Sequence, residues 1–154
     1  MKNLLIALFL LTNTFTFAHG DGGFKHSDIF KNLGPNDKVA ILMVHFGTTH
    51  DDTRALTIDA INKKVAQAFP GVEVREAYTS RMIMRRLKEN GMNKPNPMEA
   101  MDKLIADGYT HLIIQHTNII VGVEMEALQK EVASYQTKFK DIRLGTALLH
   151  SPED

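Results

Sequence analysis

Apolar residues along this chain form short runs that alternate with stretches of helical spacing. The first run is continuous and flanked by turn residues, which is typical of a strand covered on both faces in a parallel sheet. Four such segments are predicted as strands: residues 39–46 (VAILMVHF), 72–79 (VEVREAYT), 110–120 (THLIIQHTNII) and 142–149 (IRLGTALL).

The segments between these strands carry apolar positions three and four residues apart, which predicts helices. After Gly47, Asp51 or Asp52 is expected to cap a helix that Pro70 and Gly71 end. Three more helices are predicted: one capped by Ser80 and ended by Gly91, one from about Pro97 to Gly108, and one over residues 121–139. Strands that alternate with helices require right-handed crossovers. The predicted fold class is therefore α/β, a three-layer sandwich around a four-stranded parallel sheet.

The first residues follow a different pattern. Residues 1–18 hold one lysine and an apolar run from Leu4 to Leu11, and end in small residues at Thr16 and Ala18, as in a secretory signal peptide. We expect cleavage after Ala18 and a periplasmic or secreted mature protein, with an uncleaved membrane anchor as the alternative. Residues 19–37, rich in Gly, Asp and Asn, are predicted to form a flexible arm before a domain at 38–154.

Composition narrows the class of partner. A chain of 154 residues suits one domain with a single core. Its 18 basic and 18 acidic residues balance, and no basic block is present that could neutralise a row of phosphates, which argues against nucleic acid. The chain has no cysteine, so stability must come from the core rather than from disulfides. A small or metallic ligand is the expected partner.

The predicted topology brings the histidines to one edge. In a parallel sheet, sites lie beyond the carboxyl ends of the strands. Imidazole and carboxylate groups together suit a divalent transition metal. The candidate ligands at this edge are His45, His50, His116, His150 and Glu124. The alternative for His45 and His116 is a strand-end histidine hydrogen-bonded to backbone, and for Glu124 an acid stabilised by the helix dipole in a first turn.

The turn GTTHDDT at residues 47–53 also invites a phosphate-binding interpretation, because a glycine turn into a helix presents free amides. It lacks the lysine and the glycine spacing of a P-loop, and its two aspartates would repel phosphate. The chain also has no Gly-x-Ser-x-Gly elbow and no cysteine nucleophile, which disfavours covalent hydrolase chemistry.

Several segments in order resemble a known family: ILMVHFGTTHDDTR, VREAYTSRMIMRRLKENG, PNPMEAMDKLIADGYTHLIIQHTNIIVGVEMEAL and LGTALL. They are similar to the N-terminal half of the anaerobic-type sirohydrochlorin cobaltochelatases, a ferrochelatase-like family with two α/β lobes around a tetrapyrrole cleft. The resemblance implies that the family's metal ligands, two histidines and a glutamate, lie in a second lobe. We expect that lobe to be absent here, and a homo-oligomer of the chain to complete the cleft.

The resemblance implies insertion of Co²⁺ into sirohydrochlorin, with Fe²⁺ or haem as other candidate ligands. The cleft-wall residues that it assigns to substrate binding are Phe46, Gly47, Thr48, Thr79, Ser80 and Gly122. From their places at strand ends we hypothesise that His45 and His116 act catalytically, as proton acceptor or transient ligand, and that these two with Glu124 bind the metal.

Two other interpretations stay open at this point. One is a periplasmic protein that binds a tetrapyrrole, haem or metal without catalysis, using the same cleft wall. The other is a truncated gene product without an independent function, whose exposed apolar face would have to be covered or would aggregate.

Overall fold

The computed structural model describes residues 29–149. The predicted signal peptide, most of the predicted arm and His150 lie outside the described residues. Residues 29–37 form turns in which Ile29 is buried, and the ring of Phe30 stacks on Phe69 with centroids 6.3 Å apart. Among residues 29–149, no helix has the length and apolar character needed to cross a membrane.

The described residues form a four-stranded sheet in which all neighbouring strands are parallel, in the order β2-β1-β3-β4. The strands are β1 (Val39–His45), β2 (Glu73–Tyr78), β3 (His111–His116) and β4 (Asp141–Leu144). The helices are α1 (Asp51–Arg54), the π-helix η1 (Ala55–Asp59), α2 (Ala60–Ala68), α3 (Arg81–Glu89), α4 (Pro97–Ala106) and α5 (Val123–Tyr135). The predicted α/β class with a four-stranded parallel sheet is confirmed.

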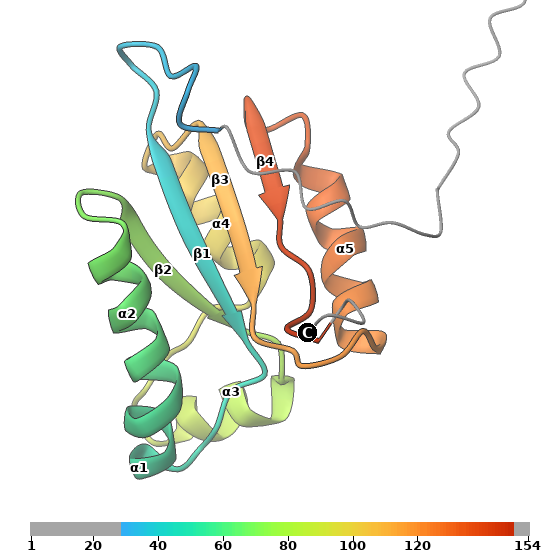
Figure 1. The fold of residues 1–154 in the computed structure, drawn as a ribbon. Helices are drawn as coiled ribbons and strands as arrows, with labels where there is room; N and C mark the ends of the chain where they lie inside the picture. The colour runs from blue at the N-terminus through green and yellow to red at the C-terminus, as the bar shows by residue number, and fades with distance from the viewer. Residues whose placement is uncertain (1–28, 150–154) are drawn as a thin grey trace, which may run out of the picture.

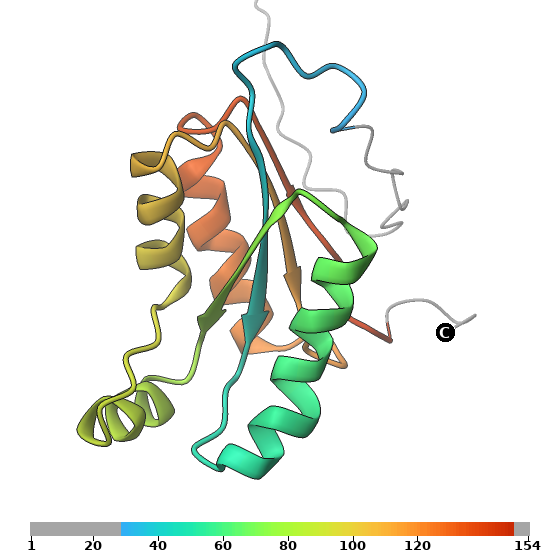
Figure 2. The same cartoon turned by 90° about the vertical axis from the view of Figure 1, so that its left-hand side faces the viewer.

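Helices cover both faces of the sheet. Figure 2 shows the layers from the side, with α2 on one face of the sheet and α4 and α5 on the other, and Figure 1 shows the order of the four strands. The short helix α3 lies below the sheet, at the edge where the strands end (Figure 1). The predicted three-layer sandwich is therefore present.

The main core lies between the sheet and the α4–α5 layer. Leu42 of β1, Leu112 of β3 and Met101 of α4 are each fully buried in it. Burying side chains of this size stabilises a fold by about 1.5–3 kcal/mol each. A smaller cluster on the α2 face joins Ile58 of η1 to Tyr78. Because side chains alternate along a strand, the consecutive residues Ala77 and Tyr78 of β2 enter two different clusters.

Three local predictions differ from the structure. The helix after Gly47 has His50 as its N-cap, so Asp51 and Asp52 lie in its first turn and neither is the cap. That helix passes through the π segment η1, which the apolar spacing does not reveal. The strands β3 and β4 end at His116 and Leu144, so the apolar residues that follow them belong to loops. The prediction made those strands too long, because apolar residues in exposed loops give the same sequence pattern as buried strand residues.

The strand order places a topological switch point between β1 and β3. The connection from β1 passes through α2 on one face to β2, whereas the connection from β3 passes through α5 on the opposite face to β4. The chain therefore moves away in opposite directions from the carboxyl ends of β1 and β3. In open parallel sheets, ligands bind at such a switch point.

Candidate functional site

Two cavities open at the carboxyl edge of the sheet, and both are lined by Phe46 and Glu124. The first, here called the helix cavity, has a volume of about 410 Å³ and lies among the N-terminal turns of α3, α4 and α5. The second, here called the loop cavity, has a volume of about 400 Å³ and follows the loop from Thr117 to Gly122. Phe46, the first residue after β1, stands between them with 53% of its surface exposed.

The N-termini of three helices form much of the wall of the helix cavity. Ser80 caps α3 by accepting a hydrogen bond from the Ile83 amide at 3.5 Å. Asn96 caps α4 in a reciprocal capping box with Glu99, both bonds being 2.9 Å long. The N-cap of α5 is Gly122, which makes no side-chain cap. Three helix N-termini therefore surround the cavity, two of them with capping side chains and that of α5 without one.

The charged residues of the helix cavity are Arg81, Glu124 and Glu131. Glu124 and Glu131 are seven residues apart on α5 and therefore share a helix face. Burial raises the pKa of Glu131, and the nearby Glu124 raises it further, whereas Arg81 lowers it. The helix cavity is thus lined by two acids and one base, with apolar contacts from Met84, Met98 and Leu128.

The loop after β1 needs a glycine beside Phe46. Gly47 has a φ of 99°, and a Cβ atom at this position would lie 2.5 Å from Cδ2 of Tyr78. Contacts that short do not occur between carbon atoms without displacement, so the Tyr78 ring and a side chain at residue 47 cannot share this space. Gly47 therefore lets the chain turn directly above Tyr78.

His45 is the last residue of β1 and is only 1% exposed. Its Nδ1 atom lies 3.1 Å from the Thr117 hydroxyl and its Nε2 atom 3.0 Å from Oδ1 of Asn62. Its ring meets that of Tyr78 edge-on, with centroids 6.3 Å apart. Burial lowers the pKa of His45, with the Asn62 hydrogen bond and the Glu76 charge opposing the shift. Both ring nitrogens are engaged within the protein, so neither is free to bind an ion in this arrangement.

His116 ends β3 and is also 1% exposed. Its Nδ1 atom accepts a 3.3 Å hydrogen bond from the Asn118 amide, while Nε2 has no hydrogen-bond partner among residues 29–149. Burial lowers the pKa of His116, and the backbone of Gly145 opposes this with a smaller effect. Because His116 is the register partner of Val44, it faces the α4–α5 layer, away from His45.

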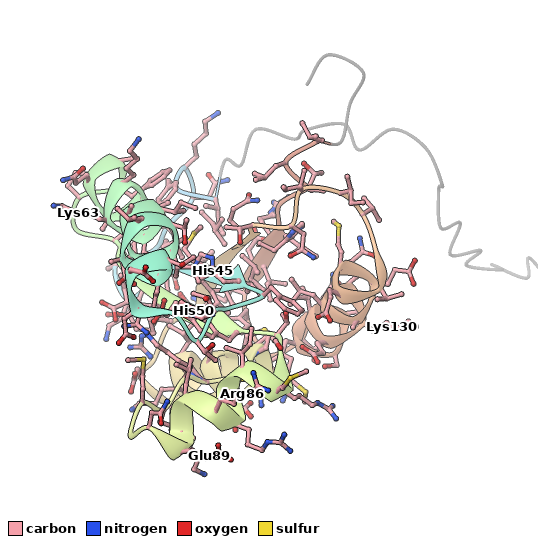
Figure 3. All side chains as sticks on the ribbon, turned by 90° about the horizontal axis from the view of Figure 1, so that it is seen from below. His45, His50, Lys63, Arg86, Glu89 and Lys130 are labelled. Carbon is pink, nitrogen blue, oxygen red and sulfur yellow. The ribbon has the colours of Figure 1, made fainter. Side chains whose placement is uncertain are left out.

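The structure brings together part of the predicted site. Phe46, Thr79, Ser80 and Glu124 line the helix cavity, and Phe46, Gly122 and Glu124 line the loop cavity. Gly47 and Thr48 follow Phe46 in the chain but line neither of these cavities. The buried His45 and His116 line neither cavity either. Figure 3, which views the edge where the strands end, shows His45 and His50 on the α2 side and Lys130 on α5 across from them.

A metal centre is not preassembled in the described part of the chain. Residues 29–149 contain no group of three or more His, Cys, Asp or Glu side chains placed to hold an ion together. The assignment of His45, His116 and Glu124 as ligands stays a prediction. In this structure the two imidazoles point to opposite faces of the sheet and so do not form a common ligand pair.

Sequence reasoning missed several lining residues. The sequence does carry a signal for those on α5, because Ala127, Leu128 and Glu131 continue from the predicted Glu124 with the i, i+3, i+4, i+7 spacing of one helix face. Asn96 could have been found from its capping box with Glu99. Arg81 and Met84 carry no comparable signal. Thr117 and Asn118 were assigned to a strand and lie instead in the loop that lines the second cavity.

An open parallel α/β lobe with a lined switch point is a class shared by many small-molecule enzymes. Comparison with known proteins identifies the family. A family model described as cobalt chelatase (CbiK) matches residues 39–154. The chain therefore belongs to the cobalt chelatase (CbiK) family.

Two curated relatives agree with this family. The sirohydrochlorin cobaltochelatase of Salmonella typhimurium is 37% identical over 118 residues, which cover 76% of this chain and 45% of that protein. The sirohydrochlorin cobaltochelatase CbiKC of Nitratidesulfovibrio vulgaris is 30% identical over 122 residues, which cover 78% of this chain and 43% of that protein. The chain thus spans about half the length of the curated relatives that it matches.

Proposed function

We propose that this chain takes part in the insertion of Co²⁺ into sirohydrochlorin, as a sirohydrochlorin cobaltochelatase-type protein. The observation that carries the proposal is the family membership of residues 39–154 together with the position of the lined cavities at the switch point. The relatives are named for this reaction. Cobalt is the metal substrate in the proposal, and the tetrapyrrole is the small-molecule partner.

The shape and chemistry of the edge support a flat, partly apolar guest. Phe46 exposes its ring between the cavities, and the neighbouring loop exposes Ile119 and Ile120. Flat aromatic macrocycles stack on such apolar surfaces. Metal insertion also releases two pyrrole protons, which must be accepted by a base. His45 and His116 remain the proposed bases, and to accept a proton each ring would have to give up a hydrogen bond that it makes in this structure.

The experiment mixes the purified chain with sirohydrochlorin and Co²⁺ and follows the absorption spectrum, with Fe²⁺ and haem as comparison ligands. Catalysed formation of the cobalt product above the rate without protein is the expected result. An Arg86→Gln variant serves as a control, since Arg86 is an exposed residue of α3 that lines neither cavity. An insertion rate equal to the protein-free rate would overturn the proposal.

A second candidate is a tetrapyrrole- or haem-binding protein without catalysis. It is favoured by one specific observation, the absence among residues 29–149 of three grouped ligand side chains. In the same experiment, a stoichiometric spectral shift without formation of the cobalt product would support this candidate over the first.

Two further proposals concern location and assembly. We propose that the chain is exported to the periplasm or secreted, on the pattern of residues 1–18. Cell fractionation with N-terminal sequencing tests this, the expected mature protein beginning at His19.

We also propose that a second copy closes the cleft, supported by the exposed Ile120, Val123 and Leu149 beside the loop cavity. Sedimentation should then show a dimer that Val123→Glu dissociates, whereas a monomer at all concentrations would contradict it.

A further inference from the structure

A chain of polar side chains runs through the molecule from an ion pair to the loop cavity. The Lys94 ammonium pairs with Oε1 of Glu76, and Oε2 of the same carboxylate accepts a 2.9 Å hydrogen bond from Nδ2 of Asn62. Oδ1 of Asn62 lies 3.0 Å from Nε2 of His45. Nδ1 of His45 lies 3.1 Å from Oγ1 of Thr117. Five residues from two strands, one helix and two loops are thus connected in series.

The ion pair fixes the direction of every bond in this series. A carboxylate paired with an ammonium can only accept hydrogen bonds. Asn62 must therefore turn its NH₂ group to Glu76 and its oxygen to His45. That oxygen in turn requires the hydrogen of the imidazole to be on Nε2, which leaves Nδ1 with a lone pair.

The lone pair on His45 determines what Thr117 can do. The Thr117 hydroxyl has one hydrogen, which Nδ1 of His45 accepts at 3.1 Å, whereas the Val44 carbonyl is farther from the same oxygen at 3.5 Å. Once that hydrogen is committed, any further hydrogen bond of this hydroxyl must be an accepted one. Thr117 also lines the loop cavity, beside Phe46 and Asn118.

We propose that Lys94 and Glu76 are positioning residues that make the Thr117 hydroxyl an obligate hydrogen-bond acceptor, which selects ligands presenting an N–H group in the loop cavity. They act through Asn62 and His45. The inference rests on the proposed function in one respect, the identity of the ligand. A metal-free tetrapyrrole carries inner N–H groups, and the metal-loaded product does not, so the acceptor favours substrate over product.

The bond direction can be tested without any ligand, by ¹⁵N NMR of the His45 ring. The wild type is expected to show a single tautomer with the hydrogen on Nε2. Glu76→Gln replaces the acceptor by an amide that can donate or accept, so both tautomers should become populated. Glu73→Gln is the matched control, because Glu73 lies on the same strand and pairs with Arg75 outside the series. A wild-type tautomer with the hydrogen on Nδ1 would overturn the inference.

The ligand preference is tested with Thr117→Val, which keeps the shape, and Thr117→Ser, which keeps the hydroxyl. Dissociation constants are measured for metal-free sirohydrochlorin and for cobalt-sirohydrochlorin. Loss of one neutral hydrogen bond should weaken binding of the metal-free form by about tenfold in Thr117→Val, with the cobalt form changed by less than about twofold and Thr117→Ser resembling the wild type.

The possible outcomes separate the two proposals. Equal weakening of both forms by Thr117→Val would mean a purely structural role and would overturn the selection of N–H groups. If the wild type binds neither form, the proposed function fails and the choice of ligand fails with it. In that case the His45 tautomer still decides whether Lys94 and Glu76 set the direction of the series.

Discussion

The imidazoles of His45 and His116 lie on opposite faces of the sheet, although the two residues end neighbouring strands. The β1–β3 register pairs His116 with Val44, and His45 is one residue further along β1. Because side chains alternate along a strand, this offset of one residue separates the two rings. His45 belongs to the α2 face with Asn62, whereas His116 belongs to the α4–α5 face.

The burial of both rings predicts a stability that falls in mild acid. Burial lowers the pKa of His45 and of His116, so the folded state binds protons more weakly than the unfolded state, where histidine has a pKa of about 6.5. Above that pH the two rings are neutral in both the folded and the unfolded state, so their contribution to the free energy of unfolding is fully present. As pH falls below it, the unfolded state gains protons first, and the free energy of unfolding should fall by up to about 1.4 kcal/mol per pH unit for each histidine.

Urea denaturation at a series of pH values measures this slope. A His45→Gln, His116→Gln double variant should show a flatter profile between about pH 6.5 and the folded-state pKa values. If the double variant keeps the wild-type slope, acid sensitivity has another origin and the two rings are not the groups responsible.

Gly47 should tolerate no side chain. Gly47→Ala places a Cβ atom 2.5 Å from the Tyr78 ring at a φ of 99°, so we expect a loss of about 2–4 kcal/mol in the free energy of unfolding. Gly91→Ala is the control, because Gly91 has a φ of 82° and its added Cβ atom meets nothing within 4 Å. That control should lose only about 1 kcal/mol. Equal losses would show that the Tyr78 contact has no energetic weight.

Removal of the Tyr78 hydroxyl should not destabilise the protein. The Tyr78 oxygen is buried and has no hydrogen-bond partner in the described part of the chain, and burial raises the pKa of this group to about 12. An unpaired buried polar group costs about 1–3 kcal/mol. Tyr78→Phe is therefore expected to leave thermal stability unchanged or to raise it, measured by calorimetry. A clear fall in the melting temperature would mean that the hydroxyl has a partner in solution.

Phe46 should contribute to ligand binding more than to stability. Its ring is exposed and lines both cavities, so Phe46→Ala should weaken sirohydrochlorin binding by about tenfold, the loss expected for one aromatic contact. Phe30→Ala is the comparison, since Phe30 has a similar exposure and stacks on Phe69, at the end of α2 remote from the carboxyl edge. Fluorescence or absorption titration measures both. Equal weakening by the two variants would argue against stacking on Phe46.

The sequence predicted the sheet, the helices and the edge that carries the cavities, because hydrophobic periodicity and helix caps are local signals. Ser80 and Pro97 mark helix starts that the structure confirms. The His50 cap and the π segment η1 were missed, because His50 makes no side-chain capping bond that the sequence could signal and apolar spacing does not distinguish a π turn from an α turn.

The site was predictable only in part. Phe46, Ser80 and Glu124 could be placed at the edge from topology. The direction in which the His45 ring points could not, because it follows from the β1–β3 register, which no single segment encodes. The connection from Lys94 to Thr117 was equally hidden, since its members are far apart in the chain and meet only after the sheet and α2 have packed together.

The proposed function requires a tetrapyrrole to bind at the carboxyl edge of this sheet, over the cavities that share Phe46. NMR shift mapping of backbone amides during titration with sirohydrochlorin locates the bound ligand. We expect shifts concentrated at residues 46–48, 79–81 and 117–124, with residues 69–72 and 107–110 at the opposite edge unchanged. Shifts centred on the opposite edge, or no saturable shifts at all, would contradict it.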